Sequence, residues 1–80
     1  MSFTLELVVK RAERALERVL GLAGRRGYEV VAASATMRDD GRAFAVRLTL
    51  LPTTGERRAE TLVRQLQRLV DVEYVSISTE

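Results

Sequence analysis

The sequence contains no cysteine and no histidine among its 80 residues. The lack of cysteine excludes disulfides, thiolate metal sites and thiol catalysis. The lack of histidine removes the commonest general base and the commonest metal ligand. No apolar run approaches the ~20 residues of a membrane span, and the N-terminus has no signal-peptide core. We therefore expect a soluble cytoplasmic protein with no membrane partner.

Neither sign of charge dominates the chain, which carries 13 basic and 11 acidic residues for a net charge of +2. A computed pI of 9.7 reflects arginines that are nearly balanced by acids, so it is weak evidence for nucleic-acid binding. The length fits one domain, residues 1–80. A domain of this size buries only about 60–65% of its unfolded surface, so self-association would add stability.

Six periodic segments follow one another along the chain in the order β-α-β-β-α-β. Apolar alternation or richness in Val, Ala and Thr predicts strands at 2–9, 28–38, 42–51 and 72–79. Apolar residues at helical spacing predict helices at 12–23 and 59–70. This order predicts an α+β, ferredoxin-like fold, with a four-stranded antiparallel sheet and both helices on one face. So short a chain leaves no room for a deep catalytic cleft, which favours a binding function.

Local signals mark the ends of these segments. Gly24 and Gly27 end the first helix. The run Asp39-Asp40-Gly41 predicts a hairpin turn, because Asp-Gly accepts the positive φ angles that such turns need. Its adjacent carboxylates point apart in a tight turn, so we expect a solvated turn and no metal site. Thr53 and Glu56 have the spacing of a capping box before the second helix.

The inward positions of these segments predict the core between sheet and helices. The predicted core residues are Phe3, Leu5, Leu7, Leu16, Val19, Leu20, Phe44, Val46, Leu48, Leu62, Leu66, Leu69, Val75 and Ile77.

The second strand gives the best indication of association. Residues 30–35 are apolar or small on both faces, and this strand is an edge in the usual order for the fold. A flat apolar edge invites pairing with another chain, so we expect a homodimer through the sheet edge. A strand that is merely rich in small residues is the alternative. We expect one small-residue patch on the open face of the sheet, the kind of surface that a partner covers, made of Val8, Ala33, Ala35, Ala43 and Ala45. The interface candidates are Val31, Ala33, Ala35, Ala43 and Ala45.

Arginines are frequent around the first helix, at positions 11, 14, 18, 25 and 26. Glu13 and Glu17 interrupt this set, so a solvated charged face is the favoured interpretation.

RNA-recognition motifs share the β-α-β-β-α-β order and stack bases on aromatics of the open sheet face. Here Phe3 and Phe44 fall on the inward sets, so the stacking platforms are missing and nucleic acid is not an expected partner. A metallochaperone of this fold would need paired cysteines.

Three stretches resemble a known family. Residues 15–20 (ALERVL), followed by Arg26-Gly27-Tyr28, resemble the first helix and second-strand entry of ACT domains. Residues 65–75 (QLQRLVDVEYV) resemble the end of the second helix and the last strand. The likeness is closest to small regulatory subunits of acetolactate (acetohydroxyacid) synthase, especially the short isozyme II type.

This resemblance implies a non-catalytic βαββαβ domain that pairs side by side into a longer sheet. It implies as partner the large, thiamine-diphosphate-dependent catalytic subunit, which condenses pyruvate or 2-ketobutyrate in branched-chain amino-acid synthesis. Thiamine diphosphate, Mg²⁺ and FAD would belong to that subunit, and the chain itself would hold no cofactor. The alternative is a free-standing ACT-like regulatory dimer that senses a small amino acid for another enzyme.

The effector site of the resembled family is altered in this chain. Amino-acid-binding members place a glycine in the loop before the first helix, where free N–H groups take a carboxylate. Arg14 stands at that position, with Arg11 nearby, and Glu29 follows Gly27 and Tyr28. A bulky side chain and an acidic group would both oppose a carboxylate, so we expect a degenerate site and no response to valine.

Overall fold

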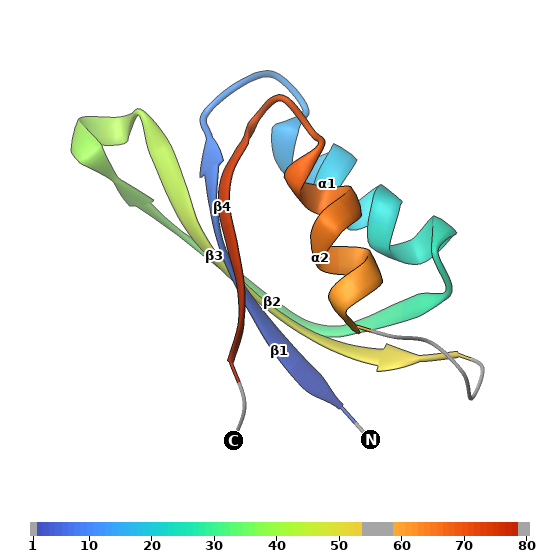
Figure 1. The fold of residues 1–80 in the computed structure, drawn as a ribbon. Helices are drawn as coiled ribbons and strands as arrows, with labels where there is room; N and C mark the ends of the chain where they lie inside the picture. The colour runs from blue at the N-terminus through green and yellow to red at the C-terminus, as the bar shows by residue number, and fades with distance from the viewer. Residues whose placement is uncertain (1, 54–58, 79–80) are drawn as a thin grey trace.

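The structure is a computed structural model that describes residues 2–53 and 59–78. Its elements run β1 (Phe3–Lys10), α1 (Ala15–Arg25), β2 (Tyr28–Arg38), the short 3-10 turn η1 (Asp39–Gly41), β3 (Ala43–Pro52), α2 (Ala59–Gln67) and β4 (Val72–Ser78). The strands form one antiparallel sheet in the order β2-β3-β1-β4, and both helices lie on one face of it (Figure 1). The predicted fold class is confirmed.

Strand register explains which side chains enter the core. Leu5 pairs with Leu48 of β3 and with Ile77 of β4, and Leu7 pairs with Val46 and Val75. Directly paired residues share a face of the sheet, so these apolar sets all point toward the helices.

Most of the predicted core is buried as expected. Eight predicted residues are buried, namely Leu5, Leu7, Val19, Val46, Leu48, Leu62, Leu66 and Val75. Five more are partly buried against them, namely Phe3, Leu16, Phe44, Leu69 and Ile77. Leu20 is a wrong prediction, since it is 38% exposed. Seven further apolar residues outside the predicted core list are also buried: Val9, Ala15, Leu22, Ala23, Tyr28, Ala43 and Leu50.

Both helices are shorter than their apolar stripes. α1 begins at Ala15, three residues after the stripe starts. α2 ends at Gln67, and the chain continues in a tighter turn in which the amides of Arg68 and Leu69 bond three residues back. Val70 therefore leaves the helical face and is 81% exposed.

The turn signals have mixed outcomes. Asp39, Asp40 and Gly41 all adopt positive φ, at 55°, 54° and 83°, so the predicted hairpin turn is confirmed. The Thr53 hydroxyl donates to the Gly27 carbonyl at 2.9 Å, which ties the entry of β2 to the end of β3. Glu56, the other half of the predicted capping box, lies outside the described residues.

The core makes a paired prediction about stability. Leu66→Ala removes a fully buried side chain and should lower the free energy of unfolding by about 2–5 kcal/mol. The control Val70→Ala shortens an apolar side chain that is 81% exposed and should change this free energy by no more than about 0.5 kcal/mol. Urea denaturation of both variants tests this, and equal losses would contradict the assigned faces.

Candidate functional site: the groove along the β2 edge

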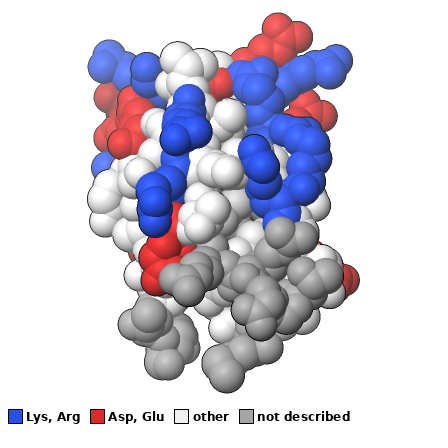
Figure 2. Space-filling view, turned by 45° about the vertical axis from the view of Figure 1, so that its right-hand side comes forward, with Lys and Arg blue, Asp and Glu red and all other residues white. Residues whose placement is uncertain are grey.

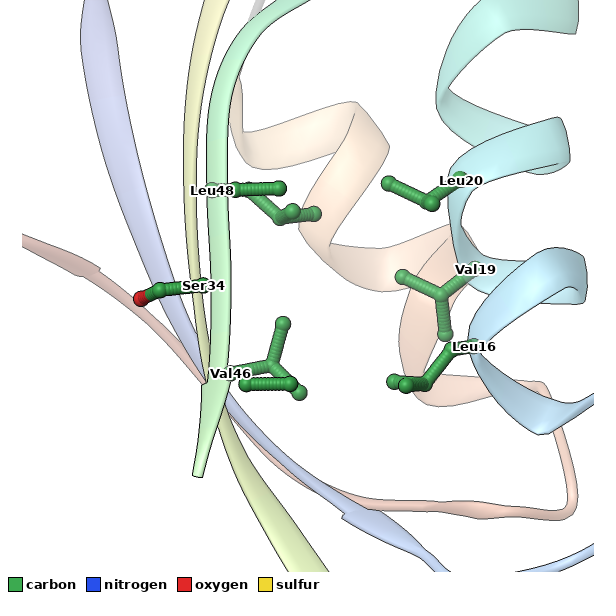
Figure 3. A pocket seen from close by; sticks show the side chains of 8 residues that line it. Leu16, Val19, Leu20, Ser34, Val46 and Leu48 are labelled. Carbon is green, nitrogen blue, oxygen red and sulfur yellow. The ribbon is translucent and has the colours of Figure 1, made fainter.

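An apolar groove lies between α1 and the β2 side of the sheet and encloses about 140 Å³. Leu16, Val19 and Leu20 line it from α1, and Val46 and Leu48 line it from β3 (Figure 3). Its β2 wall consists of residues 33–35, where the side chains are small. Small side chains on β2 cannot reach α1, so the groove stays open and Leu20 stays exposed.

A β-bulge sets which residues of β2 form this wall. Val30 pairs with Leu50, but Ala32 pairs with Thr49, so Val31 is an extra residue in the ladder. An inserted residue moves every later side chain to the other face of the sheet.

The bulge corrects the predicted patch on the open face. After it, Ala33 pairs with Leu48 and Ala35 with Val46, which places both alanines on the helix face. Ser34 takes the opposite face and points away from the helices (Figure 3). The two alanines are therefore exposed in the groove, and they do not share a surface with Val8.

The other interface candidates have separate positions. Val31 stands at the bulge and is 47% exposed. Ala45 is exposed on the open face, between Val8 and Thr36 in the ladder. Ala43 is only 3% exposed, with the long side chains of Lys10 and Arg38 on either side in the ladder, so it offers no surface.

The outer edge of β2 completes the groove. β2 pairs with β3 alone, so along its other side the described sheet presents no partner strand. Its residues from Val31 to Arg38 are all exposed. An unpaired backbone edge beside an apolar groove offers hydrogen bonds and hydrophobic burial to one and the same partner.

The predicted effector residues are not brought together within one chain. Arg11 and Arg14 precede α1, whereas Gly27, Tyr28 and Glu29 follow it. The 11 residues of α1 span about 16 Å, so these two groups lie at opposite ends of the helix. Tyr28 is buried, with its ring 5.6 Å from that of Phe3 in an edge-to-face contact.

Glu29 lies on the other face of the sheet from Tyr28, because it is the next residue along the strand and pairs with Leu51. Within a single chain, Glu29 therefore does not share a site with Arg14.

Arg14 has the backbone conformation that glycine favours. Its φ is 62° and its ψ is 17°, in the left-handed region, and it is the N-cap residue of α1. The resemblance had placed the glycine of related sites at this position, and the backbone keeps the glycine-like geometry with an arginine in it. Arg14 supplies no side-chain hydrogen bond to cap the helix.

An ion pair that sequence reasoning missed joins α1 to the turn between α2 and β4. Arg18 of α1 donates to the carboxylate of Asp71, which is buried in the turn between α2 and β4. The Asp71 carbonyl also accepts from the amide of Lys10 at 2.7 Å. The partners lie 53 positions apart, so no local pattern could indicate the contact.

Reactive side chains are scarce in the groove. No group of three or more acidic, histidine or cysteine residues suited to a metal ion occurs within it. The groove lining is apolar apart from Ser34, whose hydroxyl points away. In residues 2–53 and 59–78, neither helix has the length and apolarity needed to cross a membrane.

Comparison with known proteins agrees with this geometry. The sequence profile described as "ACT domain" matches residues 11–75. No protein of curated function matches the chain by sequence.

Solved structures share the fold at low sequence identity. The ACT domain from GTP pyrophosphokinase of Chlorobium tepidum superposes with a TM-score of 0.77 and 13% identity, covering 98% of this chain and 97% of that one. Formyltetrahydrofolate deformylase from Burkholderia mallei gives 0.75 and 22%, covering 96% of this chain but 27% of the deformylase. The C-terminal domain of MgtC from Mycobacterium tuberculosis gives 0.73 and 13%, covering 99% and 86%.

The geometry of Arg14 makes a prediction about strain. A residue with a β-carbon pays about 1–2 kcal/mol for the left-handed conformation, and glycine does not. Arg14→Gly should therefore be about 1 kcal/mol more stable than the control Arg14→Ala, which keeps the β-carbon and loses the same side chain. Thermal or urea unfolding compares the two, and an alanine variant as stable as the glycine variant would contradict the strain.

Proposed function

The chain belongs to the ACT domain family, and from this premise we propose that it is the non-catalytic small subunit of an acetolactate synthase. ACT domains are regulatory, which agrees with a chain that lacks histidine and cysteine and has an apolar groove beside β2. In this proposal it binds the large subunit and favours its active conformation. Thiamine diphosphate, Mg²⁺ and FAD are held by that subunit.

The resemblance of residues 15–28 and 65–75 to the isozyme II type supports this choice of enzyme. These two stretches contact each other in the structure, because Arg18 of the first forms an ion pair with Asp71 of the second. The fold does not select the enzyme, since the structures that share it come from proteins of unlike activity.

A homodimer is the second part of the proposal, and the β2 edge is the observation that carries it. Two copies joined antiparallel along residues 31–38 would extend the sheet and let each α1 approach the other across the groove. Burying Leu20 and the small residues of β2 would then provide hydrophobic stabilisation that a single small domain lacks.

Such a dimer also changes the effector site. Antiparallel pairing places the start of β2 in one copy near the end of β2 in the other. Arg11 lies near that end, because its guanidinium donates to the Gly41 carbonyl at 3.4 Å. Glu29 of one copy would then approach the loop before α1 of its partner, where Arg14 occupies the glycine position. We infer that this site does not hold the carboxylate of valine.

A free-standing ACT dimer that senses a small amino acid for another enzyme is the alternative. The volume and apolar lining of the groove favour it, because an aliphatic side chain fits such a space.

Dimerisation has a specific test. Ala35→Lys places a charge in the groove and should shift the chain from dimer to monomer in sedimentation experiments. The control Ala45→Lys adds the same charge to the open face and should leave the dimer intact. A wild-type monomer at high concentration, or equal effects of the two lysines, would contradict pairing along β2.

The proposed enzyme role is tested by reconstitution. The purified chain should comigrate with the large subunit and raise acetolactate formation from pyruvate severalfold, with the cofactors present. Addition of valine at about 1 mM, which would detect binding worth about 4 kcal/mol, should leave the rate unchanged. An unchanged rate of acetolactate formation without comigration would refute the small-subunit role. Calorimetric binding of an amino acid to the chain would then support the free-standing sensor.

A further inference from the structure

The outer surface of the two helices carries two columns of basic side chains with uncharged atoms between them (Figure 2). Arg14 and Arg25 flank α1 at its two ends, Arg64 lies on α2, and Arg68 lies in the turn after it. These four residues, which we call the arginine face, are exposed and have no ion pair within the described residues.

Two observations place the arginines of α1 on the side of that helix toward α2. Positions 14, 18 and 25 share one side of α1 by helical spacing. Arg18 reaches Asp71, in the turn between α2 and β4, so this side faces α2. Glu17 is next in sequence to Arg18 and therefore falls about 100° away around the helix.

This arrangement changes the interpretation of the arginines. From the sequence of α1 alone, Glu13 and Glu17 interrupt the basic set. In the fold, Glu17 falls on another side of α1 than Arg18 and Glu13 precedes the helix, while Arg64 of α2 and Arg68 of the turn after it join the arginine face. Glu60 stands four residues before Arg64 but forms no ion pair with it in the described structure.

The surface of α1 beside the arginines also has two positions without side chains, Gly21 and Gly24. A β-carbon at Gly24 would meet no atom within 4 Å, and one at Gly21 would meet only the guanidinium of Arg25, at 3.3 Å. Glycine destabilises a helix relative to alanine, and no described neighbour requires it here. A surface without side chains lets another protein backbone come close to α1.

We propose that the arginine face is the docking surface for an acidic patch on the large catalytic subunit. This inference rests on the proposed function, and it names the surface and the charge of the partner. The groove side and the arginine face lie on opposite sides of α1, so dimerisation along β2 leaves the docking surface free.

An acidic protein suits this face better than a nucleic acid does. None of the four aromatic residues lies on it, because Phe3, Tyr28 and Phe44 pack in or against the core and Tyr74 lies on β4 beside Val8. Base stacking therefore has no platform here. Unpaired guanidiniums instead match carboxylates, which they bind in a bidentate fork.

The test reverses charge on this face and on a matched control surface. Arg64→Glu/Arg68→Glu is compared with Lys10→Glu/Arg42→Glu, which makes the same change of charge at two exposed positions outside both the arginine face and residues 31–38. Affinity for the purified large subunit is measured at about 50 and 300 mM NaCl, since screening weakens exposed charge pairs. Circular dichroism and sedimentation verify that every variant folds and dimerises like the wild type.

The expected result is about tenfold weaker binding by the helix-surface variant at low salt, a shallower salt dependence than the wild type, and little change in the control. Equal affinities of wild type and Arg64→Glu/Arg68→Glu would overturn this inference while leaving the enzyme role intact. If the wild type fails to bind the large subunit, the proposed function and this assignment both fall. Binding of a labelled single-stranded RNA that is lost only in Arg64→Glu/Arg68→Glu would assign the face to nucleic acid and overturn the proposal.

Discussion

The β-bulge at Val31 is the constraint from which the described surfaces follow. One extra residue in β2 exchanges the two faces of the strand for everything that comes after it. Without it, Ser34 and Thr36 would point under α1, and Ala33 and Ala35 would point to the open face. With it, β2 brings Ala33 and Ala35 to the helix face beside α1, and these small side chains do not fill the space there.

The groove and the unpaired edge of β2 then form one continuous surface that the single chain leaves uncovered. Two helices on one face of four strands bury β1, β3 and part of β4 well, but they leave the outer half of β2 uncovered. A domain of this size has little hydrophobic burial to spare. The arginine face differs in kind, because it is charged, and this suits a partner that binds by electrostatic complementarity.

Much of the fold could be predicted from the sequence, because β1, β3 and α2 have clear periodicity and Leu5, Leu48 and Leu66 lie where it places them. The candidate site was harder to predict from the sequence. Residues 30–35 lack alternation, so the pattern does not show which residues of β2 face the helices, and it does not indicate a bulge. Leu20 continues a helical stripe, but its exposure depends on the size of side chains on another strand. Contacts such as Arg18 with Asp71 depend on tertiary structure alone.

Amide hydrogen exchange of the isolated chain, measured at low and high protein concentration, tests the central claim most directly. If β2 is the pairing edge, amides on the free side of residues 31–38 become protected as concentration rises, while those on the outer edge of β4 keep their exchange rates. Protection that is independent of concentration, or that appears on β4 instead, would contradict the account.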